Sequence, residues 1–177
     1  MRDVPLAEPV EVWHIARTMN SINKESFPDI SSVFEAVDFL IASKKTRDDI
    51  LKQISELLFS QVDHYNWVGF YIVDESGTNL ILGPYVGAAT DHVKIAFGKG
   101  ICGQVAVSEM SSVIQDVSQE DNYLSCSSNV QSEVVFPIMR EGKFVAELDI
   151  DSHAISPFTD QDTELLEAIC VKLADLF

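Results

Sequence analysis

Three acidic residues in the C-terminal half are spaced so that a β-sheet could bring them together. In the segment "ELDID", Glu147, Asp149 and Asp151 alternate with apolar residues. Successive side chains of a strand point to opposite faces, so these carboxylates would share one face. Glu133 lies in the preceding segment "SEVVFPIMR", and the turn "EG" joins the two segments into a predicted hairpin. We therefore expect Glu133, Asp149 and Asp151 to converge on one patch.

Gathered carboxylates can do chemistry that single ones cannot. They raise one another's pKa, which can leave one of them protonated as a general acid near neutral pH. They also attract ammonium groups or metal ions. The four histidines show neither His-x-x-x-His nor Cys/His ligand spacing, and no EF-hand-like loop is present, so no metal site is expected. A solvated sheet face remains the alternative interpretation of the acidic residues.

The three cysteines differ in their surroundings. Cys170 lies on the apolar stripe of the last predicted helix and is expected to be structural. Cys102 follows "GKG" at an expected helix start, where the helix dipole favours a thiolate, although a small core residue would fit there equally well. Cys126 lies in the polar loop segment "YLSCSSN", where a thiol has no packing purpose. Cys126 is therefore the best candidate for a nucleophile.

Two further motifs bear on binding. In "NWVGFYIVD", Trp67, Gly69 and Tyr71 share one strand face, either as an aromatic wall with an open floor at the glycine or as residues covered by a helix. The segment "GKGICG" formally matches G-x-G-x-x-G, but the surrounding segments are hairpins rather than a parallel βαβ unit. We interpret these glycines as a tight turn and expect no cofactor.

The elements that must position these residues follow from hydrophobic periodicity. Helical patterns cover residues 31–45 and 46–62, and a third begins after the expected N-cap Thr159. Between them the chain shows two hairpins, over 66–87 and 132–151, separated by a short helix at 101–109 and a polar loop. This order predicts an α+β domain in which N- and C-terminal helices cover one face of a central antiparallel sheet. The other face would carry a loop-rich pocket.

Composition limits the classes of function. The chain has 177 residues and a formal net charge of −16, which argues against broad binding to nucleic acid or to anionic membranes. No apolar run approaches the roughly 18 residues that a membrane helix needs. An odd number of cysteines without a CxxC pair suits a reducing, cytoplasmic location. We expect a domain over residues 31–177 and an extension over 1–30, with a helix at 8–24.

Taken together, these segments resemble the free methionine-(R)-sulfoxide reductases, enzymes built on a GAF domain. The resemblance runs from about residue 32 to 177 and is carried by a set of short motifs. They are "NWVGFY", "LGPYVG", "FGKGICG", the loop cysteine followed by "SE", "LDIDS" and "FTDQD". GAF sensor domains in general share the fold but not this set.

The resemblance implies an activity and assigns residues to it. The family reduces the R-epimer of free methionine sulfoxide and is recycled by thioredoxin. Cys126 matches the catalytic cysteine and Cys102 a second redox cysteine. Acidic residues that line the substrate pocket match Glu133, Asp149 and Asp151, and aromatic contacts match Trp67 and Tyr71. The resemblance is also compatible with a homodimer.

Two positions depart from the family pattern. Many members have a third redox cysteine where this chain has His92, so either Cys102 or an external thiol must resolve the sulfenic acid. Glu147 stands where a small or apolar residue is commoner, and the sequence assigns it no role beyond a solvated position on that face. The main alternative to an enzyme is a GAF module that binds a small molecule as a sensor without turnover.

Overall fold

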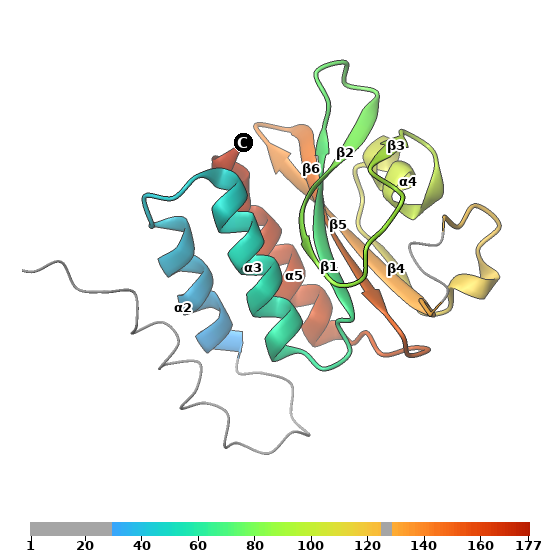
Figure 1. Cartoon of the computed structure of the whole chain (residues 1–177), viewed down its shortest axis with the longest axis horizontal. Helices are drawn as coiled ribbons and strands as arrows, with labels where there is room; N and C mark the ends of the chain where they lie inside the picture. Colours follow the sequence, from blue (N-terminus) through green and yellow to red (C-terminus); the bar gives the residue numbers. More distant parts are fainter. Residues whose placement is uncertain (1–29, 125–128) are drawn as a thin grey trace, which may run out of the picture.

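The computed structural model describes residues 30–124 and 129–177 (Figure 1). The predicted N-terminal extension with its helix at 8–24 therefore lies outside the described residues, apart from Ile30. None of the helices in the described part is both long enough and apolar enough to span a membrane.

The three predicted long helices are confirmed, and local capping sets where two of them begin. They are α2 (Ile30–Ile41), α3 (Arg47–Gln61) and α5 (Asp160–Leu173). Helix α3 starts after Thr46, whose hydroxyl accepts a hydrogen bond from the backbone amide of Asp49 at 3.2 Å. Helix α5 starts after Thr159, which forms a capping box with Asp162.

Six antiparallel strands form one sheet in the order β3-β2-β1-β6-β5-β4. The predicted hairpins are β1–β2 and β5–β6, and β1 pairs with β6 to join them. The edge strands β3 and β4 were not expected, because three-residue segments carry almost no periodic signal. The strand bounds are Trp67–Val73 (β1), Asn79–Val86 (β2), Lys94–Ala96 (β3), Ser112–Ile114 (β4), Ser132–Arg140 (β5) and Lys143–Ser152 (β6).

The two faces of the sheet carry different layers (Figure 1). Helices α3 and α5 cover one face, where Phe70, Leu148 and Ile150 are buried in the main hydrophobic core, and α2 packs on these two helices. Helix α4 (Gly100–Ser108) lies on the other face and packs on β5 and β6. Two short 3-10 helices, η1 (Val117–Gln119) and η2 (Ala174–Leu176), complete the described elements. The expected α+β architecture, with N- and C-terminal helices on one face of the sheet, is confirmed.

A buried polar network anchors the start of α5 to the end of α3. The Asp162 carboxylate accepts hydrogen bonds from the Tyr65 hydroxyl at 2.8 Å and from His64 Nε2 at 2.9 Å. It also accepts a bond at 2.7 Å from the backbone amide of Thr159. Burial alone would raise the pKa of Asp162, but these hydrogen bonds outweigh burial and lower it.

Asp162→Asn should therefore lower the free energy of unfolding by about 2–3 kcal/mol at pH 7, because it removes charge-assisted hydrogen bonds and a cap. Since the folded-state pKa lies below the unfolded value, this stabilisation is present above the unfolded pKa and is lost as the pH falls through the folded one. Urea unfolding at pH 7 and at low pH measures both effects. The matched control is Asp160→Asn, at an exposed position of the same helix. Equal losses in the two variants would contradict the assignment.

Candidate active site

Strand register places the predicted carboxylates in adjacent rows on the α4 side of the sheet. Asp151 lies opposite Glu133 on β5 and opposite Trp67 on β1. Asp149 lies opposite Gly69, one row further along the same face. Both aspartates and Glu133 are at most 3% exposed. The alternative of a solvated sheet face is therefore wrong, and the expected convergence of the three residues is confirmed.

The N-terminal turn of α4 brings a thiol onto these carboxylates. Cys102 Sγ lies 3.5 Å from Asp149 Oδ2 and 3.9 Å from Glu133 Oε1. Cys102 is in the first turn of a helix that begins at Gly100, as the sequence predicted, and its side chain is buried. The thiol has one proton to donate, so it can satisfy only one of the two acceptors at a time. The structure thus brings Cys102, Glu133 and Asp149 into one cluster.

Burial controls the protonation of this cluster. Removal from water raises the pKa of Asp149 to about 7, although contact with the Cys102 thiol lowers it in part. Burial, and then the charges of Asp149, Asp151 and Glu147, raise the pKa of Glu133 well above its usual range. Among the described residues, no lysine, arginine or histidine forms an ion pair with Glu133 or Asp149. The carboxyl groups can therefore hold protons near neutral pH.

Glu147 is a fourth carboxyl on this face, as alternation predicted, but its burial was not predicted. It lies opposite Tyr71 on β1 and Pro137 on β5, and it is fully buried rather than solvated. Neither carboxylate oxygen has a hydrogen-bond partner among the described residues. Burial and the charge of Asp149 raise its pKa well above the usual range, and the nearby Cys102 thiol lowers it in part.

The aromatic wall is present, but its floor is closed. The Trp67 indole covers Gly69, because a Cβ atom built there would lie 2.3 Å from the ring. Trp67 stacks on Tyr85 at 5.2 Å between ring centroids and is parallel to Tyr71 at 6.4 Å. The sequence did not predict that Tyr85 belongs to this aromatic wall, because its strand, β2, shows no alternation of apolar and polar residues. The expectation of an open floor at Gly69 is therefore wrong.

Two hydrogen bonds tie the wall to the loop after β2. Trp67 Nε1 donates to the Ala88 carbonyl at 3.1 Å, and the Tyr71 hydroxyl donates to the His92 carbonyl at 2.9 Å. His92 thus reaches the candidate site through its backbone. These bonds fix the orientation of both rings.

Gly69→Ala should displace the indole, because the added methyl group collides with Trp67 and with Tyr85 Cβ, which would lie 2.6 Å away. We expect a loss of about 2 kcal/mol in the free energy of unfolding, typical of overpacking. Near-UV circular dichroism should change together with stability. Gly77→Ala is the control. An added Cβ atom there meets no other atom within 4 Å, so this variant introduces backbone strain, at a φ of +69°, without a collision. An unchanged aromatic signal in Gly69→Ala would count against this packing.

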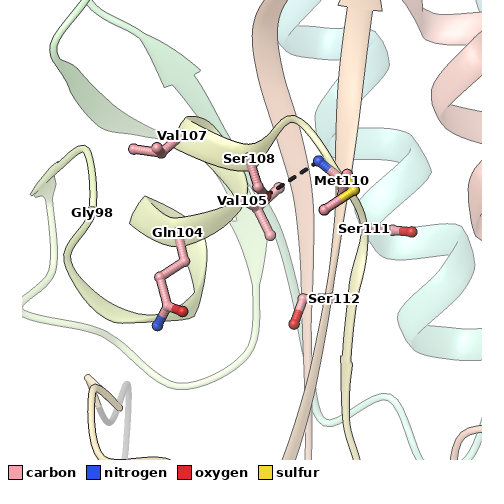
Figure 2. Close-up of a pocket in the computed structure, with 8 residues that line it drawn as sticks. All are labelled: Gly98, Gln104, Val105, Val107, Ser108, Met110, Ser111 and Ser112. Atoms are coloured by element: carbon pink, nitrogen blue, oxygen red, sulfur yellow. Dashed lines mark hydrogen bonds between the residues drawn. The ribbon is translucent and has the colours of Figure 1, made fainter.

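An open hollow of about 350 Å³ lies between α4 and the segment that leads into β4, and no residue of the carboxyl cluster is among its lining residues. Figure 2 shows its lining, which includes Gln104, Ser108 and Met110. None of the described residues that line it has an ionisable side chain. Its serine hydroxyls therefore have no acid or base beside them among the described lining residues, and the hollow is not the candidate active site.

The other two cysteines, Cys170 and Cys126, are not part of the described cluster. Cys170 is buried on the opposite side of the sheet, where its thiol donates to the Phe136 carbonyl at 3.7 Å, as expected of a structural residue. Burial raises its pKa far above the usual range. Cys126, the predicted nucleophile, lies outside the described residues. Its placement at the site therefore stays a prediction.

Known proteins share both this sequence and this fold. Residues 46–175 match the GAF domain family. The free methionine-R-sulfoxide reductase of Escherichia coli (strain K12) is 31% identical over 149 residues, which cover 84% of this chain and 87% of that protein.

Two solved structures extend the comparison. The free methionine-R-sulfoxide reductase of Neisseria meningitidis, in complex with its substrate, is 28% identical with a TM-score of 0.79, and the match covers 84% of this chain and 87% of that one. The fRMsr of Staphylococcus aureus in its reduced form is 36% identical with a TM-score of 0.75, covering 82% and 92%. The chain thus belongs to the free methionine-R-sulfoxide reductases, oxidoreductases acting on sulfur that are built on a GAF domain.

Proposed function

We propose that this protein reduces free L-methionine-(R)-sulfoxide to L-methionine by thiol chemistry. The observation that carries the proposal is the buried cluster of Glu133, Asp149 and Asp151 beside an aromatic wall, on the sheet face that α4 covers. A free amino acid has an ammonium group, and buried carboxylates provide the matching charge. The thioether end of methionine suits the faces of Trp67 and Tyr71.

The carboxyl cluster also supplies what the reaction needs. A sulfoxide is a poor electrophile until its oxygen is protonated or strongly hydrogen-bonded. Asp149, with a pKa of about 7, can carry a proton at neutral pH, and the pKa of Glu133 is raised as well. One carboxyl would therefore donate to the sulfoxide oxygen while another binds the ammonium group. For these two roles, one carboxyl must be protonated and the other ionised. Repulsion between two neighbouring negative charges favours this arrangement over one in which both are ionised.

The covalent step is assigned to Cys126. Its thiolate attacks the sulfoxide sulfur, the protonated oxygen is transferred to the cysteine sulfur, and methionine leaves with the cysteine as a sulfenic acid. The thiol of Cys102 then attacks that sulfenic acid, which releases water and forms a disulfide. Thioredoxin, a dithiol, would reduce the disulfide and complete the cycle in the reducing cytoplasm. His92 cannot resolve the sulfenic acid, so the resolving step falls to Cys102 or to an external thiol.

The direct test incubates the purified protein with free L-methionine-(R)-sulfoxide and dithiothreitol and measures methionine by chromatography. We expect catalytic release of methionine and no reduction of the S-epimer. Tight binding of the sulfoxide without release of methionine would instead identify a GAF module that binds its ligand as a sensor. Absence of both binding and turnover would reject the proposal.

A further inference from the structure

The cluster that would bind the substrate also has the composition of a site for a soft divalent cation. Cys102, Glu133 and Asp149 each offer one ligand atom, and these three atoms lie within 4.8 Å of one another. They come from α4, β5 and β6, so rigid elements hold all three. The spacing of residues along the chain does not reveal this site, because Glu133 and Asp149 lie 31 and 47 positions after Cys102.

The spacing matches tetrahedral coordination. A zinc ion with a sulfur ligand at about 2.3 Å and an oxygen ligand at about 2.0 Å holds the two atoms about 3.5 Å apart. Cys102 Sγ and Asp149 Oδ2 are already 3.5 Å apart, and Cys102 Sγ and Glu133 Oε1 are 3.9 Å apart. Small side-chain rotations would therefore suffice to bring these atoms around one ion.

Glu147 is the independent observation that points to a cation. Its side chain is fully buried, neither of its oxygens has a hydrogen-bond partner among the described residues, and it lies two positions from Asp149 on the same face of β6. One oxygen of Asp149 is likewise buried without a described partner. Buried polar atoms are almost always satisfied, so such a group next to a thiol and two carboxyls calls for a ligand.

We propose that Cys102, Glu133, Asp149 and Glu147 bind one Zn²⁺-class ion in the reduced protein. A thiolate ligand selects zinc and similar ions over Mg²⁺ and Ca²⁺, which prefer oxygen ligands alone. An ion here would occupy the carboxylates assigned to the substrate ammonium group, so it would compete with methionine sulfoxide. That competition rests on the proposed function, whereas binding of the ion does not.

Cobalt substitution tests the site without any measurement of activity. The protein, reduced with a phosphine that does not bind the ion strongly, is titrated with Co²⁺, and bound cobalt is then displaced by Zn²⁺. We expect one ion per chain, with sulfur-to-cobalt charge-transfer absorption and the visible bands of tetrahedral cobalt. Cys102→Ser should abolish the charge-transfer band and weaken zinc binding at least about 100-fold, and Glu147→Gln should weaken it about 10-fold.

Two cysteine variants serve as controls. Cys126→Ser and Cys170→Ser should keep the charge-transfer band, and far-UV circular dichroism establishes that each variant is folded. Loss of the band in Cys126→Ser but not in Cys102→Ser would overturn the assignment. Absence of stoichiometric cobalt binding to the intact, folded protein would overturn the proposal itself. If the ion binds but does not compete with the sulfoxide, the metal site stands and the proposed location of the substrate is wrong.

Discussion

Replacement of Cys126 by serine is expected to abolish the reduction of methionine sulfoxide. A serine hydroxyl is not ionised near neutral pH and cannot form a sulfenic acid, so the step that transfers oxygen to the enzyme is lost. We expect kcat with dithiothreitol to fall at least about 1000-fold, as is typical when a nucleophile is removed. Binding of the sulfoxide, measured by calorimetry, should persist because the carboxylates and the aromatic wall remain.

The other two cysteines provide contrasts for this experiment. Cys170→Ala should retain turnover within a factor of about 3, because the thiol lies behind the sheet and only donates to a backbone carbonyl. Cys102→Ser should still release one equivalent of methionine in a single turnover but lose recycling by thioredoxin. Full multiple-turnover activity in Cys126→Ser would refute the assigned nucleophile.

Asp149→Asn should have effects of opposite sign on activity and on stability. For activity, the amide cannot donate an acidic proton to the sulfoxide oxygen or pair with an ammonium group. We expect kcat/KM to fall about 100- to 1000-fold, as when a preorganised electrostatic contact is removed. Initial rates with free L-methionine-(R)-sulfoxide measure this loss.

For stability, the same substitution removes a buried charge. The pKa of Asp149 in the folded protein, about 7, lies above the unfolded value of 3.8. The contribution of the Asp149 carboxyl to the free energy of unfolding is therefore fully present below the unfolded pKa. It is lost as the pH rises through the folded pKa of about 7. At about 1.4 kcal/mol per pH unit, this loss is on the order of 4 kcal/mol above pH 8. The variant should thus exceed the original protein in unfolding free energy at pH 8 but not at pH 5.

Urea unfolding at both pH values tests this crossover. Asp175→Asn, at an exposed position near the C-terminus, is the matched control and should change neither activity nor the pH dependence of stability. A variant that is active and destabilised at pH 8 would show that Asp149 is a structural residue held as an anion.

The sequence predicted the parts of this protein in which a pattern is long or a cap is explicit. Thr46 and Thr159 carry capping side chains, so the starts of α3 and α5 were predicted to within a residue. Alternation along 147–151 correctly assigned its carboxylates to one face and Leu148 to the core. The three-residue strands β3 and β4 were not predicted, because their pairing with β2 and β5 defines them and their own composition does not.

The details of the candidate site depend on contacts that no local pattern encodes. Register decides that Asp151 faces Glu133 and Trp67, and alternation alone cannot set register. Glu147 had no role predicted from the sequence, and it is buried because α4 covers that face of the sheet and excludes water from it. The closed floor at Gly69 arises from the rotamer of Trp67, which a side-chain pattern does not reveal.

The central claim is that the buried carboxylates recognise the ammonium group of a free amino acid. It is tested most directly by comparing kcat/KM for free L-methionine-(R)-sulfoxide with kcat/KM for its N-acetyl derivative, which keeps the sulfoxide but lacks the positive charge. Loss of a charge-assisted contact to buried partners should reduce kcat/KM for the N-acetyl compound at least about 100-fold. Equal values for the two substrates would contradict the claim.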